Sequence, residues 1–285
     1  MCIRDSTEIM SNSLTKESYY EGLTSYPAAR CVRILNPLSA DLNVMRQTLL
    51  FNTMEAVQLN ANRRNGNLRL YEFGNCYFYD EAARDAEKPL SAYSEQYRLA
   101  IAVTGAAVPQ SWNAKPQASS FFTLRAVAEK LLRRFGLDIY ALKCEPLQSD
   151  LFGDGISLSA GNGRELLQMG VVAPRIRRAF DLKQEVYYLE MNFDALVKST
   201  RKHRIAFEEL SKFPEVKRDL ALLVDRQVTF AQLRAIALAT ERKLLKSVSL
   251  FDVYEGDKLP EGKKSYALSF VLEDKSQTLT DKAIE

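Results

Sequence analysis

The side chains that could perform chemistry are few in this sequence, and their spacing builds no obvious reactive site. The only histidine, His203, stands among basic residues in the segment 198–204, where its ring is solvated or adds to a positive face. The sequence contains four cysteines, Cys2, Cys31, Cys76 and Cys144. They show no C-x-x-C spacing, which favours reduced, mostly buried thiols over disulfides or a zinc site. We therefore predict no catalytic histidine and no metal site.

The composition is that of a folded protein without a membrane span. The 285 residues, 46% hydrophobic and 26% charged, suffice for one large or two ordinary domains. No apolar run approaches the roughly 20 residues that span a bilayer, and the N-terminal MCIRDS is charged where a signal peptide is apolar. The net charge of +3 does not indicate nucleic-acid binding, because phosphate affinity follows local clusters of Lys and Arg. We expect a cytoplasmic protein.

The first part of the chain is predicted to be rich in strands with helices around them. Apolar residues recur at steps of three and four within 42–65, which predicts a helix. The run at 67–79 predicts a long strand in which Gly74 allows a bulge. Ser120 is predicted to cap a helix that ends near Gly136. Further strands are predicted at 96–105, 139–145, 155–160, 166–173 and 185–191, with turns at 153–155 and 161–163.

A second domain is predicted to begin near Glu209, after a basic linker at 198–204. Its expected elements are a strand at 216–225, a helix at 229–244, a strand at 247–255, a turn at 256–262, a strand at 264–273 and a helix from about 280. This βαββα order is one strand short of the ferredoxin-like unit.

Several stretches occur in the order in which one protein family shows them. The sequence reads VRILNPLSADLNVMRQTLL at 32–50, NLRLYEFGNCYF at 67–78, KFPEVKRDLALLVD at 212–225 and LFDVYEGDKLPEGKKSYALSFVLED at 250–274. The combination of N-P-L-S and M-R with F-P-x-V-x-R-D and F-D-V-Y-x-G is specific as a set. From about residue 8 to its end, the chain resembles the β subunit of bacterial phenylalanine-tRNA ligase.

The resemblance implies an α+β fold. Residues 7–200 resemble a non-catalytic class II synthetase-like module, an antiparallel sheet flanked by helices. Residues 209–285 resemble a ferredoxin-fold anticodon-binding domain that is incomplete at its C-terminus. The resemblance also implies an α2β2 ligase whose α subunit activates the amino acid with ATP and Mg²⁺. The chain itself is then expected to bind tRNA, and neither a cofactor nor DNA nor a membrane.

The residues agree with a module that has lost catalysis. Class II catalysis needs arginines on sheet strands and a Gly-rich strand-to-helix element to neutralise ATP phosphates. The nearest candidate, GNGR at 161–164, is predicted to form a hairpin turn between short strands. Arg69 and Glu72 are spaced so that they lie on opposite faces of their strand, and we predict structural roles for both. No residue of this chain is predicted to be catalytic.

The segment 36–51 is the candidate contact with the α subunit. The proposed interface residues are Asn36, Pro37, Met45 and Arg46. The Asn36 side chain can hydrogen-bond the backbone in a turn. The planar guanidinium of Arg46 can donate two hydrogen bonds to a carboxylate across an interface. Ordinary packing of this segment against the sheet is an equally open alternative.

The second domain is the candidate tRNA-binding region, because a sheet with helices on one face leaves the other face open to bases. Phe251 and Tyr254 are predicted on opposite faces of one strand, so that one of them can stack, and we choose Tyr254. Packing of both rings inside the domain is the alternative. Arg218 could instead pair with Asp219. The full set of predicted contacts is Lys212, Lys217, Arg218, Tyr254, Lys263 and Lys264.

The sequence also departs from the family pattern. The editing and N-terminal tRNA-binding domains are absent, MCIRDS has no counterpart, and the chain stops within its last helix before a fourth strand, as expected of a fragment. The strand at 216–225 is then expected to be an edge strand. Two other functions stay open, a stand-alone ferredoxin-like RNA-binding or regulatory protein and a free-standing class II enzyme. Association with a phenylalanine-specific α subunit would favour the ligase subunit over the stand-alone protein. Formation of an aminoacyl-adenylate by the chain alone would favour the free-standing enzyme.

Overall fold

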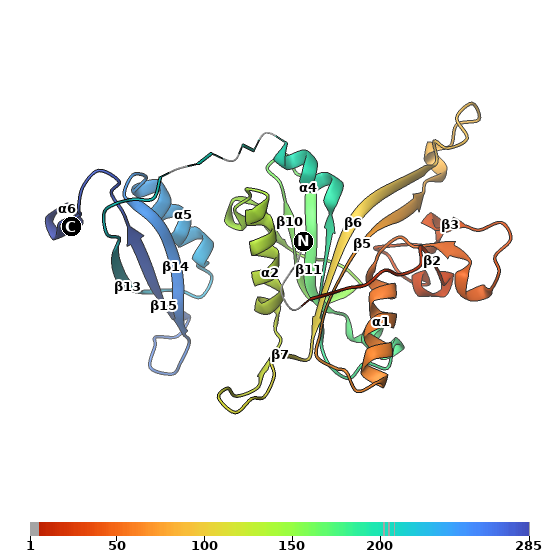
Figure 1. Cartoon of the computed structure of the whole chain (residues 1–285), viewed down its shortest axis with the longest axis horizontal. Coiled ribbons are helices and arrows are strands. Elements are labelled where there is room, and N and C mark those ends of the chain that lie inside the picture. Colours follow the sequence, from red (N-terminus) through yellow and green to blue (C-terminus); the bar gives the residue numbers. More distant parts are fainter. Residues whose placement is uncertain (1–5, 202, 205, 208, 285) are drawn as a thin grey trace. The chain divides into compact units, whose positions relative to one another are not determined.

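The computed structural model describes residues 6–201, 203–204, 206–207 and 209–284. The chain divides into two compact units, Met1–Arg204 and Ile205–Glu285, which we call unit 1 and unit 2. Each is described by itself (Figure 1). No helix among the described residues is long and apolar enough to cross a membrane.

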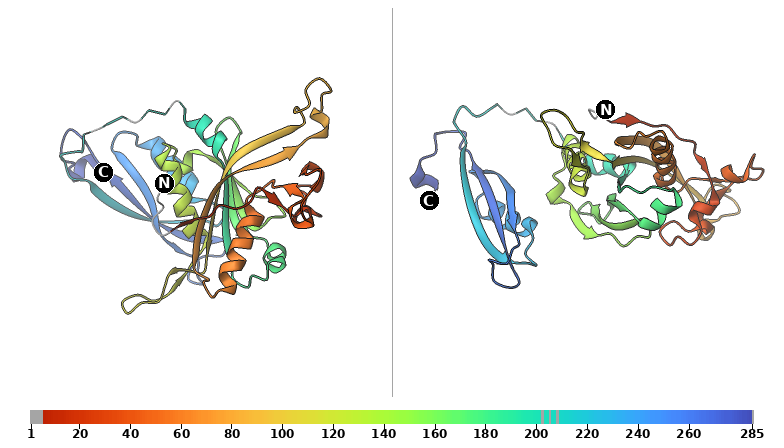
Figure 2. Two further views of the ribbon diagram at one scale, coloured as in Figure 1. Left: turned by 45° about the vertical axis from the view of Figure 1, so that its right-hand side comes forward. Right: turned by 90° about the horizontal axis from the view of Figure 1, so that it is seen from below.

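Unit 1 is built on a seven-stranded sheet in the order β1-β5-β6-β12-β11-β10-β9. All neighbours pair antiparallel except β1 with β5. The strands are β1 (Thr7–Glu8), β5 (Leu68–Tyr79), β6 (Tyr93–Thr104), β9 (Lys143–Pro146), β10 (Phe152–Ser159), β11 (Glu165–Val172) and β12 (Val186–Asn192). The β5–β6 hairpin extends beyond the rest of the sheet (Figures 1 and 2).

Helices cover both faces of this sheet, and each face has its own apolar core. Helices α1 (Leu50–Asn62) and α3 (Pro174–Ala179) contribute to a core with Leu70, Val186 and Tyr188. Helices α2 (Phe121–Arg134) and α4 (Phe193–Thr200) contribute to the other, with Leu189 and Met191. Because successive side chains of β12 point to opposite faces, one strand supplies both cores.

Smaller elements surround the sheet. Strands β2 (Leu14–Thr15), β4 (Val44–Met45) and β3 (Val32–Arg33) form one small sheet, and β7 (Ala106–Val108) pairs with β8 (Gln117–Ala118). The short 3-10 helices are η1 (Glu17–Tyr20), η2 (Ala28–Arg30), η3 (Ala40–Leu42), η4 (Glu81–Ala83) and η5 (Ile139–Ala141).

The predicted helix at 42–65 begins later than expected, because α1 starts at Leu50. The preceding residues form η3 and β4, and β4 pairs with both β2 and β3. The apolar spacing at Leu42, Met45 and Leu49 therefore belongs to a non-helical segment, in which Leu49 is buried and the other two are partly buried. Long-range strand pairing has overridden a local helical pattern, which spacing alone cannot reveal.

Of the two turns predicted at glycine residues, one is confirmed and the other is wrong. Residues 161–163 form the hairpin turn between β10 and β11, and Gly163 has a φ of 78° that suits glycine. Residues 153–155 were predicted as a turn but lie inside β10, where the register shifts between Phe152 and Asp154. Gly153 marks a bulge within a continuous strand, and Gly155 pairs regularly with Gly170.

The predicted helix at 121–136 is confirmed in detail. Ser120 and Thr123 form a reciprocal capping box, and the chain leaves the helix at Gly136 with a φ of 77°. The ring of His203 lies against Gly136, where a Cβ atom would meet it. Of the thiols, Cys31 and Cys76 are buried as expected, Cys144 is exposed, and Cys2 lies outside the described residues.

Unit 2 contains one three-stranded antiparallel sheet in the order β13-β15-β14. Its elements are β13 (Val216–Asp225), α5 (Phe230–Thr240), β14 (Leu245–Tyr254), β15 (Lys263–Leu272) and α6 (Asp281–Ile284). This is the predicted βαββα order. Helix α5 packs against β14, and the buried residues Val248, Tyr266 and Leu268 mark the covered face. Among the described residues β13 pairs only with β15, so it lies at the edge as expected.

Candidate functional site

The first candidate site, at Arg46, is a buried ion pair inside unit 1. Arg46 is 3% exposed and Glu72 is 1% exposed. Arg46 Nη1 lies 2.7 Å from Glu72 Oε1 and donates to Ser11 Oγ, and Arg46 Nε donates to the carbonyl of Asn75. The expectation that Arg46 reaches a carboxylate across a subunit interface is therefore corrected. Its guanidinium is occupied by Glu72 of the same chain, because the backbone N–H of Tyr77 in β5 donates to the Arg46 carbonyl and holds Arg46 beside that strand.

Gly74 explains why this arrangement is possible. A Cβ atom at this position would lie 2.1 Å from Arg46 Nη2. The register of β5 with β6 continues through Gly74 without a shift, so the expected bulge is absent from this strand pair. The glycine provides room for the arginine rather than a break in the strand. Glu72 and Arg69 lie on opposite faces, as predicted, and Glu72 has the structural role expected of it.

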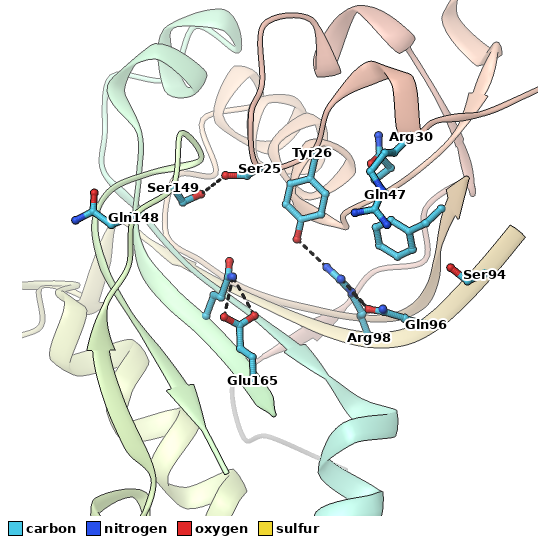
Figure 3. Close-up of a pocket in the computed structure, with 12 residues that line it drawn as sticks. Ser25, Tyr26, Arg30, Gln47, Ser94, Gln96, Arg98, Gln148, Ser149 and Glu165 are labelled. Atoms are coloured by element: carbon cyan, nitrogen blue, oxygen red, sulfur yellow. Dashed lines mark hydrogen bonds between the residues drawn. The ribbon is translucent and has the colours of Figure 1, made fainter. Parts of the chain in front are cut away.

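A polar cavity of about 280 Å³ lies between the sheet and the loop at 24–30 (Figure 3). It adjoins a second cavity of about 230 Å³. Arg98 on β6 is the central cation, and its Nη1 donates to Tyr26 and pairs with Glu190 on β12. Burial acts to lower the pKa of Arg98, but Tyr26 and Glu190 raise it well above its usual value. Arg98 therefore stays charged and paired inside the chain.

The carboxylate of Glu190 is fully engaged as well. It accepts hydrogen bonds from the hydroxyls of Thr48 and Tyr188 and from the backbone N–H of Leu49. These partners join the start of α1 to the centre of the sheet across more than a hundred residues. The network is a structural junction, and it leaves Glu190 no free oxygen for catalysis.

The cavity does not fit ATP with magnesium. The cavity is lined by two cations and two carboxylates: Arg98 is paired with Glu190, and exposed Arg30, which lies over the Phe78 ring, is balanced in charge by Glu165 on the β11 wall. Glu165 accepts from Ser157 and Gln168. The part of the chain that the structure describes contains no cluster of three His, Cys, Asp or Glu suited to a metal ion. Triphosphate binding needs several uncommitted cations, which this wall does not supply.

An exposed apolar loop lies next to the small sheet. Leu35 and Leu38 are 93% and 99% exposed, and Asn36 and Pro37 between them are exposed too. Met45 is partly buried in β4. Of the four predicted interface residues, the structure thus places Asn36 and Pro37 on an accessible surface, while Arg46 is inside. The two leucines were missed as candidates, although apolar residues on either side of Asn36-Pro37, in an expected turn, were a visible signal.

The open face of the unit 2 sheet carries two exposed aromatic rings. Phe251 is 58% exposed and Tyr254 is 43% exposed. The register of β14 with β15 shifts between Leu250 and Asp252, which places a bulge at Phe251. Tyr254 is opposite Ser265, and Lys217 of β13 lies 5.8 Å from the Phe251 ring centroid. The expectation of opposite faces is wrong, because the bulge breaks the alternation and leaves both rings on the uncovered side.

The remaining predicted tRNA contacts divide between the two faces. Lys212 is exposed, and Lys263 bonds Asp225 at 2.6 Å in the cross-strand pair that begins β15. Arg218 lies on the covered face and pairs with Asp281 rather than Asp219. The prediction that Lys264 is an exposed tRNA contact is wrong. Its side chain is 7% exposed, and its Nζ lies 4.5 Å from the Tyr266 ring centroid. It follows the inward alternation of β15, so it is not at the exposed turn.

Family models match residues of both units. A family model described as "Phenylalanyl tRNA synthetase beta chain CLM domain" matches residues 1–193. A second, "Ferredoxin-fold anticodon binding domain", matches residues 211–285. Among solved structures, pyrrolysyl-tRNA synthetase from Desulfitobacterium hafniense is similar at a TM-score of 0.49 and 13% identity, over 67% of this chain and 62% of that one.

Two curated relatives illustrate the match in sequence. The chain is 49% identical over 278 residues to "Phenylalanine--tRNA ligase beta subunit" of Bacteroides fragilis. The aligned region is 98% of this chain and 34% of that protein. The protein of the same name from Porphyromonas gingivalis is 44% identical with the same coverage. The chain thus spans about a third of the length of these relatives. On these matches and on its two folds, the chain belongs to the phenylalanyl-tRNA synthetase β chain family.

Proposed function

We propose that this chain is a non-catalytic part of a phenylalanine-tRNA ligase, in which unit 1 docks on an α subunit and unit 2 binds tRNA. The names and domains of the relatives support this function. The expected setting is a cytoplasmic α2β2 ligase that uses ATP and Mg²⁺ on the α subunit. The observation that carries the non-catalytic role is the neutralised sheet cavity, in which Arg98 and Glu190 bind each other.

The test of this role is ATP–pyrophosphate exchange with phenylalanine. The chain alone should show background exchange, and exchange should appear when an α subunit from a relative is added. Exchange by the chain alone at a rate that disappears in Arg98→Ala would contradict the proposal. That result would instead favour a free-standing class II enzyme.

We propose that the loop at 34–38 contacts the α subunit. Its leucines are almost fully exposed, and buried apolar anchors dominate the affinity of protein interfaces. Exposed Asn36 and Pro37 lie between the two leucines, and Met45 lies in β4. We expect Leu35→Asp with Leu38→Asp to abolish co-purification with the α subunit. Leu90→Asp is the matched control, because Leu90 is 78% exposed in the loop of the β5–β6 hairpin. Equal loss in the control would remove the loop from the interface.

We propose that the open face of unit 2 binds tRNA through Phe251, Tyr254 and Lys217. On this face the central strand carries the small residues Ser265, Ala267 and buried Ser269, so the rings are not crowded by large neighbours. Base stacking on an aromatic side chain contributes about 1–3 kcal/mol. Lys212 and Lys263 are the further cations that can approach a phosphate.

The double variant Phe251→Ala with Tyr254→Ala tests this surface in the full chain. We expect at least a tenfold loss of tRNA affinity with unchanged thermal unfolding. Phe122→Ala is the control, because Phe122 is 74% exposed on α2 of unit 1. Unchanged affinity in the double variant would place the tRNA surface elsewhere.

A further inference from the structure

Two basic segments of unit 1, far apart in sequence, meet at one end of the sheet. Arg63 and Arg64 follow the C-terminus of α1, and the second segment runs through α3 to residue 185. Gln184 joins them, since its Nε2 donates to the carbonyl of Gly66 at 2.9 Å. We call the two ranges 63–66 and 174–185 the basic end. Neither segment contains a recognisable binding motif, and only the fold brings them together.

The charge of the basic end is concentrated and largely unneutralised. It contains six cations, Arg63, Arg64, Arg175, Arg177, Arg178 and Lys183, against the two carboxylates Asp181 and Glu185. The difference of +4 exceeds the net charge of +3 of the whole chain. Within the part of the chain that the structure describes, none of the six cations forms a salt bridge. Glu185 accepts the hydroxyl of Tyr187 instead.

Some of these cations support the surface while others are free to bind. Arg177 donates to the carbonyls of Val172 and Gln184, and thereby fixes the chain on both sides of α3. Arg175 donates to the carbonyl of Glu21. The side chains of Arg63, Arg64 and Lys183 are exposed and make no hydrogen bond to the described chain, and exposed Arg178 bonds only within its own helix. A groove of about 520 Å³ lies beside Arg178 and Lys183.

The chemistry of this surface selects its partner. None of the residues 63–66 and 174–185 is among the exposed large apolar side chains, because Ile176, Phe180 and Leu182 point into the core. A protein interface needs apolar or aromatic anchors, and a single-stranded nucleic acid needs exposed rings for stacking. A concentration of arginine and lysine without either matches the phosphate backbone of a duplex.

We propose that the basic end binds the phosphate backbone of an RNA stem, independently of base sequence. This site is separate from the open face of unit 2, so it does not depend on anticodon recognition. If the proposed ligase function holds, the stem belongs to the bound tRNA, and the two units contact different parts of one RNA.

The test uses the full chain and a duplex RNA of about 16 base pairs with arbitrary sequence, the length that a duplex-binding domain can span. Binding is measured by fluorescence anisotropy between about 0.05 and 0.2 M salt. We expect Arg63→Gln with Arg64→Gln, and separately Arg178→Gln with Lys183→Gln, each to weaken binding about tenfold at low salt. Each pair should flatten the slope of log K against log salt by about two units, one for each lost phosphate contact.

Three controls distinguish binding at the basic end from general charge attraction and from binding by unit 2. Lys130→Gln with Arg134→Gln removes the same charge from exposed positions of α2, on the opposite face of the sheet, and should leave binding and slope unchanged. Arg63→Lys with Arg64→Lys should keep the slope, because phosphate contacts depend on charge. Phe251→Ala with Tyr254→Ala should not affect the duplex, so that failure of the tRNA proposal and failure of this one are distinguishable.

Several results would overturn the inference. One is equal weakening by the α2 control, which would indicate non-specific attraction. Another is an effect from only one of the two glutamine pairs, which would mean that the segments do not form one surface. A third is binding of vesicles with about 30% phosphatidylserine through these residues when the duplex does not bind, which would assign the basic end to lipid headgroups.

Discussion

Units 1 and 2 both fold around an antiparallel sheet, but they bury very different amounts of it. In unit 1, helices cover both faces and produce two apolar cores, and a complete ion pair lies inside. Among the described residues of unit 2, the buried apolar side chains are Val248, Tyr266, Leu268 and Leu279. In β13, Leu220 and Leu223 are 48% and 54% exposed. The number of covered faces decides how much apolar area leaves water, and therefore how far each unit is stabilised.

The largest expected effect comes from opening the buried ion pair of unit 1. Glu72→Ala leaves the guanidinium of Arg46 buried with no carboxylate, which should destabilise unit 1 by about 3–5 kcal/mol. Chemical denaturation measures it. Glu81→Ala is the control, because its pair with Arg84 is exposed and should contribute at most about 1 kcal/mol. If the two variants lost similar free energy of unfolding, burial of the Arg46–Glu72 pair would not make its disruption more destabilising.

The second prediction compares matched leucines in the two units. Leu189 is fully buried in β12 and Leu268 is 1% exposed in β15. Leu189→Ala should cost about 3–5 kcal/mol, and Leu268→Ala about 2–3 kcal/mol, because a thin unit collapses more easily around a cavity. Amide exchange in β12 and β15 reports each unit separately. A larger loss at Leu268 would show that unit 2 has the tighter core.

The third prediction concerns pH and the loops that border the cavity. Partial burial acts to raise the pKa of Asp150, but hydrogen bonds from Ser25 and Thr24 outweigh it and lower the pKa below its ordinary value. A lowered folded-state pKa means that the stabilisation is present above the unfolded pKa of about 4 and is lost as pH falls through the folded value. Asp150→Asn should therefore cost about 1 kcal/mol at neutral pH, discounted for exposure, and nothing at strongly acidic pH.

Glu241 in unit 2 provides the comparison for this pH effect. Its carboxylate accepts from the backbone N–H groups of Leu244 and Lys243, which lower its pKa. Glu241→Gln should lower folding stability at neutral pH and have less effect as pH falls, as Asp150→Asn does. The loss of stability should be confined to unit 2. Stability curves of the two variants from neutral to acidic pH check this. A difference from the unsubstituted chain that grows as pH falls would reverse the sign worked out here.

The last prediction, of similar size to the pH effect, compares two helix caps of the same design. Ser120 with Thr123 closes a capping box on α2, and Thr229 with Gln232 closes one on α5. Ser120→Ala and Thr229→Ala should each cost about 1 kcal/mol. Amide exchange should show the loss only near the start of α2 in unit 1, but throughout the sheet in unit 2, where α5 provides the cover. If the loss of amide-exchange protection spread equally far in both units, the two sheets would not differ in how strongly they depend on their helices.

Local patterns in the sequence determined much of the fold. The alternation in β13 and β15, the capping residue of α2 and the glycine turn at 161–163 each depend on neighbours within a few residues, so their spacing was sufficient. The ordered motifs likewise indicated the family, which the comparisons established. The order of elements in unit 2 followed from the same kind of information.

Only the tertiary structure decided which side chains remain accessible. Arg46 is paired because its backbone bonds Tyr77 of β5, and Phe251 faces outward because of a bulge in β14. The basic segments 63–66 and 174–185 are joined by the bond from Gln184 to Gly66. Each outcome depends on contacts between residues distant in sequence. Residue type predicts what a side chain can bind, whereas packing against distant segments decides whether it is free to do so.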